Sequence, residues 1–140
     1  MFIFIFASVI TYDIWFFVTH YVLHKNILAI NHKIHHNVDV QCMTFKDAYI
    51  CDYIEGPFQS LGCMFPLFFS FDLVGFSIAI VIINIRALLR HDMKYQSYIG
   101  NHHILHHKYP QYNFGEYWID VLCGTDYANK AEYVYGVFYT

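Results

Sequence analysis

The sequence predicts an all-α integral membrane protein, a helical bundle that carries a histidine-rich helical cap on its cytosolic side. Three observations predict this class. Hydrophobic residues make up 57% of the 140 residues and charged residues only 14%, the mean hydropathy is +0.33, and nine of the ten histidines fall in short clusters. Such a composition is too apolar for an ordinary soluble domain. The length predicts a single domain, residues 1–140.

The charge and cysteine content exclude other classes. Eight Lys and Arg stand against 11 Asp and Glu, for a formal net charge of −3, so the chain offers no basic surface and we expect no nucleic-acid partner. The four cysteines form no C-x-x-C pair, which favours neither a disulfide framework nor a thiolate metal site. We expect them to be reduced packing residues: Cys42, Cys51, Cys63 and Cys123.

The first predicted element is a transmembrane helix over Met1–Thr19. This stretch is apolar over about the length that spans a hydrocarbon core, and Asp13 is its only charged side chain. A cleaved signal peptide is the alternative, but the stretch lacks a basic start and a clear small-residue cleavage site. Asp13 has no partner that the sequence alone identifies.

The second apolar zone, Pro57–Leu89, is too long for one ordinary crossing. We expect a hairpin with arms over Tyr53–Phe69 and Leu73–Arg90 and a turn near Ser70–Asp72. Each arm would rise roughly 26 Å at 1.5 Å per residue, close to the ~30 Å thickness of the hydrocarbon core. A single crossing would leave the early and late histidines on opposite faces of the membrane, whereas a hairpin brings them to one face.

The distribution of basic residues indicates which face that is. Most of them fall in or beside the segments that carry histidines, and the positive-inside rule places such segments in the cytosol. The residues concerned are Lys25, Lys33, Lys46, Arg86, Arg90, Lys94 and Lys108.

Histidine spacing predicts a metal site. Within the clusters, histidines three or four residues apart share one face of a helix. Crowded imidazoles repel one another when protonated and leave unpaired polar edges when buried neutral, so a cation that binds neutral imidazole satisfies them best. Eight to ten ring nitrogens exceed the needs of one tetrahedral ion, so we expect two ions, and imidazole suits zinc, copper, iron and nickel. The candidate ligands are His20, His24, His32, His35, His36, His91, His102, His103, His106 and His107.

Other polar residues near the clusters are candidates for orienting the rings. A ligating imidazole usually donates its second ring N–H to a carboxylate or carbonyl acceptor. Solvated polar residues and helix caps are the equal alternative for each of these candidates, which are Asp39, Asn113, Glu116 and Asp120. His91 stands outside the clusters, and for it a capping or hydrogen-bonding role is the main alternative to ligation.

These motifs resemble the fatty acid hydroxylase superfamily, which includes sterol desaturases, sterol methyl oxidases, lipid hydroxylases and carotenoid hydroxylases. The chain carries H-x-x-x-H, then H-x-x-H-H, then the apolar hairpin, then H-x-x-H-H followed by W-x-D-x-x-x-G-T. The matching segments are HYVLH (20–24), HKIHH (32–36), HHILHHKYPQYNFGEYWIDVLCGT (102–125) and, as a weaker match, Glu55-Gly56-Pro57. The resemblance therefore covers most of the chain.

The resemblance implies a histidine-ligated pair of irons that uses O2 and two electrons to hydroxylate or desaturate a C–H bond of a sterol or fatty acyl lipid. It also implies an external electron donor, a cytochrome b-type protein or a reductase, and an endoplasmic reticulum membrane with the histidine site facing the cytosol. Lipid hydroxylases of this group often carry a second histidine four residues after the one that ends the hairpin. This chain has His91 and then Tyr95, so either one ligand is missing or His102 replaces it.

Two other functions remain open at this point. The first is a non-catalytic or degenerate metal-binding membrane subunit that keeps the fold. The second is a membrane electron-transfer protein in which paired histidines ligate haem. Bis-histidine haem needs one ring from each of two facing helices, which would leave most of the ten histidines without a role.

Overall fold

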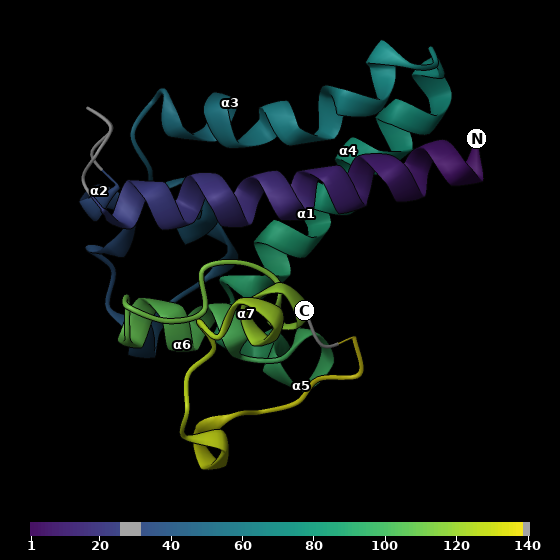
Figure 1. Ribbon diagram of the computed structural model, residues 1–140. Coiled ribbons are helices and arrows are strands. Elements are labelled where there is room, and N and C mark those ends of the chain that lie inside the picture. The colour runs from purple at the N-terminus through teal and green to yellow at the C-terminus, as the bar shows by residue number, and fades with distance from the viewer. Residues whose placement is uncertain (26–31, 139–140) are drawn as a thin grey trace.

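The computed structural model of the chain describes residues 1–25 and 32–138 (Figure 1). Within these residues the regular structure is helical and contains no β strand, which confirms the predicted all-α class. The α helices are α1 (Phe2–His24), α2 (Lys33–His36), α3 (Glu55–Ser60), α4 (Leu73–Arg90), α5 (Gln96–Ile99), α6 (His102–Lys108) and α7 (Tyr117–Cys123). The 3-10 helices are η1 (Val40–Cys42), η2 (Phe45–Tyr49), η3 (Leu61–Phe68), η4 (Met93–Tyr95) and η5 (Lys130–Glu132).

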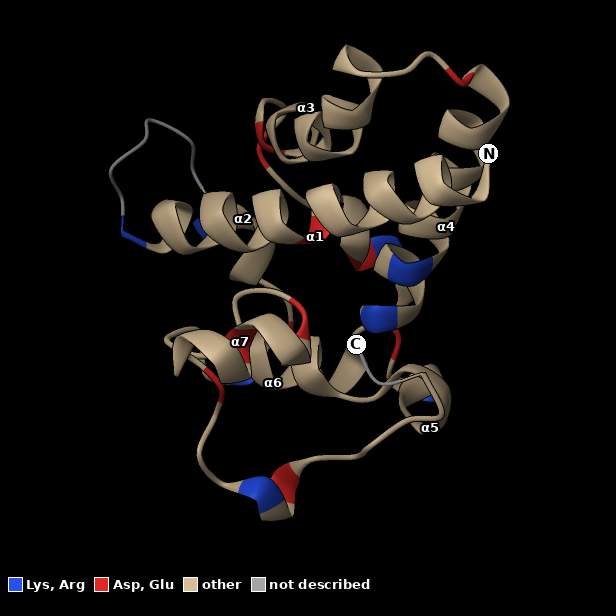
Figure 2. Cartoon of the chain, turned by 45° about the vertical axis from the view of Figure 1, so that its right-hand side comes forward, with Lys and Arg blue, Asp and Glu red and all other residues tan. Residues whose placement is uncertain are grey.

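Two of the described helices, α1 and α4, are long and apolar enough to cross a membrane by length and composition. α4 has the bounds expected for the second arm, and α1 continues beyond the predicted membrane span, which ends at Thr19, to His24. Figure 2 shows few charged residues along either helix. Much of their apolar surface faces outward, as expected of helices covered by lipid; exposed examples are Phe2, Ile3, Phe6, Leu73, Val74 and Val81.

The first arm of the hairpin differs from the expected continuous helix, because it consists of α3 followed by the 3-10 helix η3. Pro66 lies inside η3 and has no backbone N–H to donate to an α-helical bond. The arm nevertheless packs tightly along α1. A Cβ added at Gly62 would come within 2.5 Å of the Trp15 Cβ, and Trp15 Nε1 donates a hydrogen bond to Phe58 O at 2.9 Å.

The chain turns back between η3 and α4, where the hairpin turn was expected. Asp72 caps α4 by accepting a hydrogen bond from Gly75 N at 2.8 Å. α4 then runs back toward the end of α1 that carries His24 (Figure 1). As a result, His91 after α4 reaches the early histidines, and its Nε2 lies 3.2 Å from His35 Nε2.

The C-terminal half of the chain holds α6 beneath α1 in the view of Figure 1. The loop between α6 and α7 touches α1, since a Cβ added at Gly115 would lie 2.8 Å from the Phe17 Cβ. The segment after α7 returns to the start of α6. There Asn101 donates to Glu132 O at 2.8 Å and accepts from Val134 N at 2.9 Å.

A buried charge network joins α1, α4 and the start of α7. Arg86 Nη2 donates to Asp13 Oδ1 at 3.1 Å and also pairs with Glu116, which pairs with Arg90 as well. The side chains of Asp13 and Glu116 are 3% and 2% exposed. The fold therefore supplies the partner of Asp13, which was unidentified in the sequence.

Candidate metal centre

Nine of the ten histidines gather in two groups, in each of which the potential ligand atoms all lie within 4.8 Å of one another. The first group has five imidazoles: His20, His24, His32, His36 and His106. The second group has four: His35, His91, His103 and His107. Neither group contains a carboxylate or a thiol.

Neighbouring residues in the chain serve different groups. On α2, His36 belongs to the first group and His35 to the second; on α6, His106 belongs to the first and His107 to the second. Adjacent residues on a helix point about 100° apart, which follows from 3.6 residues per turn. Each histidine pair therefore reaches two neighbouring centres.

Backbone carbonyls from the loop after α6 fix two rings of the first group. His20 Nδ1 donates to Phe114 O at 2.6 Å, and His106 Nδ1 donates to Tyr112 O at 2.6 Å. A carbonyl oxygen only accepts, so the proton of each neutral ring lies on Nδ1. Each Nε2 is left with a lone pair directed into the group.

A carboxylate fixes a third ring of the first group. His32 Nδ1 donates to Glu55 Oε1 at 2.7 Å, and both side chains are buried. In the neutral form of His32 this bond leaves a lone pair on Nε2, which lies 2.9 Å from His20 Nε2. Two unprotonated nitrogens therefore face each other at hydrogen-bonding distance without a proton between them.

The second group repeats this arrangement. His35 Nδ1 donates to Ile50 O at 3.0 Å, and His91 Nδ1 donates to Ala87 O at 2.7 Å. Their Nε2 atoms, 3.2 Å apart, again carry lone pairs that face each other. His103 Nε2 lies 3.0 Å from His91 Nε2, and both ring nitrogens of His107 are buried without a hydrogen-bond partner.

These atoms fit a pair of cations. Facing lone pairs repel, and a positive ion between them replaces that repulsion with coordination. An all-imidazole donor set suits zinc, copper, iron and nickel and is unlike the oxygen sites of calcium or magnesium. The Nδ1 bonds to carbonyl and carboxylate oxygens are the outer hydrogen bonds that metal-ligating imidazoles usually make.

Burial favours the neutral form of several of the rings in the absence of metal. Burial, reinforced by the charge of neighbouring imidazoles, lowers the pKa of His36 to about 2 and that of His91 to about 3. The pKa values of His103, His106 and His107 are also lowered, chiefly by burial. Neutral imidazole is the form that binds a metal ion, so the site holds its ligands ready at neutral pH.

A model of the fatty acid hydroxylase family matches residues 5–125, a span that contains both histidine groups. The chain belongs to the fatty acid hydroxylase family. Members are typically iron-dependent, membrane-associated oxidoreductases, so membership indicates a lipid hydroxylase or desaturase type of function. No curated protein and no solved structure matches the chain.

In this member of the fatty acid hydroxylase family, His102 joins neither group, contrary to the expectation that it would be a ligand. Its Nε2 donates to Asp120 Oδ2 at 3.0 Å. Asp120 also accepts from Phe114 N at 2.9 Å and from Gly115 N at 2.8 Å. Asp120 therefore orders the loop whose Phe114 carbonyl holds His20, and it contacts no imidazole of either group through a described hydrogen bond.

The other three residues expected to orient rings act elsewhere. Asn113 has a φ of 60°, and its side chain donates to His102 O at 3.0 Å and accepts from Tyr127 N at 2.8 Å. Glu116 holds the two arginines of α4. Asp39 is exposed and caps η1 through Gln41 N at 3.0 Å, which is the helix-cap alternative.

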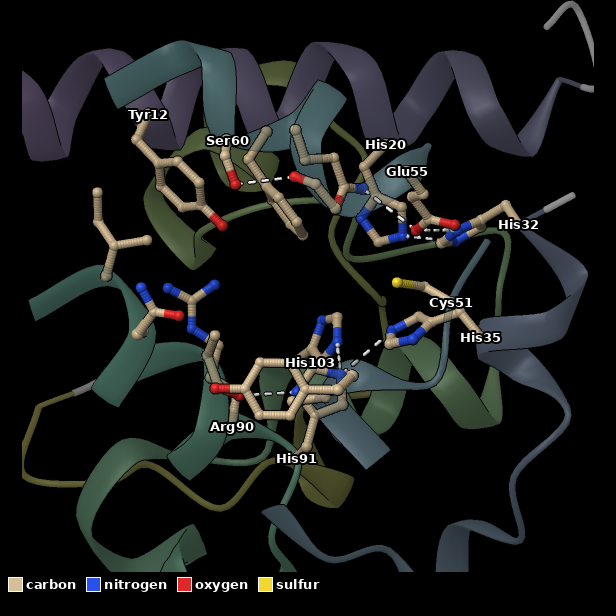
Figure 3. Close-up of a pocket in the computed structure, with 18 residues that line it drawn as sticks. Tyr12, His20, His32, His35, Cys51, Glu55, Ser60, Arg90, His91 and His103 are labelled. Carbon is tan, nitrogen blue, oxygen red and sulfur yellow. Dashed lines mark hydrogen bonds and ion pairs between the residues drawn. The ribbon is translucent and has the colours of Figure 1, made fainter. Parts of the chain in front are cut away.

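A cavity of about 150 Å³ opens onto the two histidine groups (Figure 3). α1, α3 and α4 line it together with the segment around Tyr49. Five histidines face it: His20, His32, His35, His91 and His103. The cavity therefore adjoins both histidine groups.

Proposed function

We propose that this protein is a membrane-bound di-iron oxidoreductase that uses O2 and two electrons to hydroxylate or desaturate a lipid C–H bond. The observation that carries the proposal is the convergence of nine imidazoles, seven of them buried, into two carboxylate-free groups beside one cavity. Family membership supports the lipid as the class of substrate. Iron bound by the two groups would supply the activation of O2 and the removal of hydrogen from an unactivated carbon.

The chain's own residues prepare the site in three ways. Carbonyls and Glu55 hold the rings in one tautomer and orientation, which reduces the rearrangement needed on metal binding. Burial of nearly all ligands keeps water from competing for the centres. The cavity between α1, α3 and α4 limits which part of a substrate reaches the histidines.

The proposal also includes the membrane in which the reaction takes place, the side that the site faces and the source of electrons. The outward apolar faces of α1 and α4 suit a lipid bilayer. Basic residues beside the histidine segments support a cytosolic site, and the family resemblance supports the endoplasmic reticulum. Electrons would come from an external donor, a cytochrome b-type protein or a reductase.

Metal analysis combined with oxygen uptake tests the proposal. The purified, iron-reconstituted protein should hold close to two irons and consume O2 with a lipid and a reductant. Substitution of one ligand from each group, His36→Ala or His107→Ala, should abolish turnover while membrane insertion is retained. Asn37→Ala, beside His36 but exposed, is the matched control and should keep both iron and activity. Full activity in both histidine variants would refute the assigned site.

The same experiment separates the enzyme from a degenerate metal-binding subunit. A degenerate subunit would bind iron and insert into the membrane but would consume no O2 with any lipid in a panel of sterols, fatty acids, alcohols and acyl amides. Product analysis by lipid mass spectrometry then distinguishes hydroxylation from desaturation.

A further inference from the structure

The cavity beside the metal centre has two chemically different walls. Figure 3 shows His20, His32 and His35 on one side and Tyr12 and Arg90 on the other, with their polar ends turned into the cavity. Asn84 of α4 also lines it. A cavity for a plain hydrocarbon chain would need no polar wall opposite the imidazoles.

The wall formed by Tyr12, Asn84 and Arg90, called the polar wall, carries hydrogen-bonding atoms that have no partner in the described part of the chain. Among the described residues, no hydrogen bond uses the Tyr12 hydroxyl. Asn84 donates through Nδ2 to Ile80 O at 2.8 Å, and no described bond uses its Oδ1. Arg90 Nε is buried without a partner. Because an unused buried polar atom such as Arg90 Nε is costly, a ligand that bonds to it, and also to Tyr12 and Asn84, gains affinity.

The position of Asn84 supports the same conclusion. Asn84 is exposed on an apolar helix of membrane-spanning length, where an amide is unfavourable unless it has a use. Ser60, at the end of α3, is exposed and lines the same cavity. The cavity lining therefore includes exposed residues on both α3 and α4, and an opening between them would face lipid.

The size of the cavity limits what it holds. About 150 Å³ has room for on the order of ten water-sized groups, and it is smaller than the roughly 300–1,000 Å³ of sites that enclose a whole drug-sized ligand. Only one end of a lipid fits, and the remainder must extend through the opening. Any group held by the polar wall therefore lies within a few atoms of the carbon presented to the histidines.

The charges around the cavity select a neutral group. Arg90 is paired with Glu116, and Arg86 is paired with Asp13 as well as Glu116, so two cations meet two anions. Glu55 adds a further carboxylate to the cavity wall. A substrate carboxylate would lose its hydration without meeting surplus positive charge.

We propose that Tyr12, Asn84 and Arg90 bind a neutral oxygen-bearing group of the substrate, a hydroxyl or an ester or amide carbonyl, next to the carbon that reacts. The inference rests on the proposed function of the site and adds the substrate class. The substrate is an uncharged, oxygenated lipid that enters by its polar end. Free fatty acids and plain hydrocarbons are disfavoured.

Binding to the iron-loaded full chain, kept anaerobic and without reductant, tests this class directly. The probes are tritiated 1-hexadecanol, hexadecanoate and hexadecane, with cholestanol and cholestane as a second carbon skeleton. On at least one skeleton the alcohol should bind about tenfold more tightly than the hydrocarbon, and hexadecanoate should bind more weakly than 1-hexadecanol. Tyr12→Phe should weaken alcohol binding about fivefold, the value of one ordinary hydrogen bond, and leave hydrocarbon binding unchanged.

Two further variants keep the test decisive. Asn84→Leu should act like Tyr12→Phe and lies on an exposed surface, so it serves if Tyr12→Phe fails to fold. Tyr21→Phe, on α1 but outside the cavity lining, is the matched control and should bind every probe as the parent does. Equal affinity for alcohol and hydrocarbon on both skeletons, tighter binding of the acid, or equal losses for both probes in the variants would overturn the proposal. The binding measurement involves no turnover. If the protein consumes no O2 in the separate assay, the proposed enzymatic function is refuted, but the binding result still stands.

Discussion

The guanidinium of Arg86 holds the carboxylate of Asp13 inside the helical bundle, with Nη2 3.1 Å from Oδ1. The two residues lie on different apolar helices, α4 and α1, and each would be costly alone in that setting. The two residues differ in the number of their charged partners. Asp13 has one cationic partner in the described network, whereas Arg86 also serves Glu116.

This inequality predicts different costs for the two halves of the pair. Arg86→Met leaves Asp13 as an uncompensated buried charge and should destabilise the protein by about 3–5 kcal/mol. Asp13→Asn leaves Arg86 paired with Glu116 and should cost only about 1–2 kcal/mol. Thermal unfolding in detergent measures both, with Lys94→Met at an exposed site as control. A larger loss for Asp13→Asn than for Arg86→Met would contradict the described network.

His102 and His106 predict opposite results for the same substitution. His102→Gln should keep close to two irons and lower thermal stability, because His102 bonds to Asp120 and lies outside both groups. His106→Gln should lose iron from the first group, because its Nε2 lies 3.1 Å from His36 Nε2 among the facing ligands. Iron content by mass spectrometry distinguishes them. Equal iron loss in both variants would restore His102 as a ligand.

Glu55 should tune metal affinity through His32. Glu55→Ala removes the acceptor of the His32 Nδ1 proton and should weaken zinc binding by about 10–100-fold. Glu55→Gln keeps an acceptor oxygen without the charge, so its loss should be smaller. Competition with a chelator measures the affinity. Asp39→Asn, a change at an exposed helix cap, should have no effect; an effect as large as that of Glu55→Ala would mean that the contact with His32 is not the cause.

The metal-free protein should lose stability in acid. Folding lowers the pKa of His36 to about 2 and that of His91 to about 3, while the unfolded chain titrates near 6.5. Between about pH 6.5 and pH 3 the unfolded state therefore binds more protons than the folded state, so the free energy of unfolding falls as the pH is lowered. Each such histidine contributes a slope of about 1.4 kcal/mol per pH unit. Denaturation midpoints from pH 8 to pH 4 check this, and a flat profile would contradict the buried neutral rings.

Much of the fold and of the candidate metal site could be predicted from the pattern and composition of the sequence. The α4 bounds follow from an apolar stretch between Asp72, a capping residue, and Arg90. The spacing of the histidines predicted a metal site and their number predicted two ions, and the fold gathers nine of the rings into two groups. Both features could be predicted because they depend on residue type and spacing within short stretches of the sequence.

The remaining features depend on contacts across the fold. The four-residue offset from His106 suggested that His102 shares its role, but Asp120 from the next helix binds the His102 ring instead. The acceptors of His20 and His106 are the carbonyls of Phe114 and Tyr112, and a carbonyl has no side-chain signature. Glu55 belonged to a recognisable E-G-P segment, yet only the fold shows that it faces His32.

The division of neighbouring histidines between the two groups means that the groups are linked through the peptide backbone. His35 and His36 are joined by one peptide bond, and so are His106 and His107, while each pair serves both centres. Consecutive Cα atoms stay 3.8 Å apart across a trans peptide. Two short covalent links thus join the two histidine groups, so changes in helix tilt or bilayer thickness cannot draw the groups far apart.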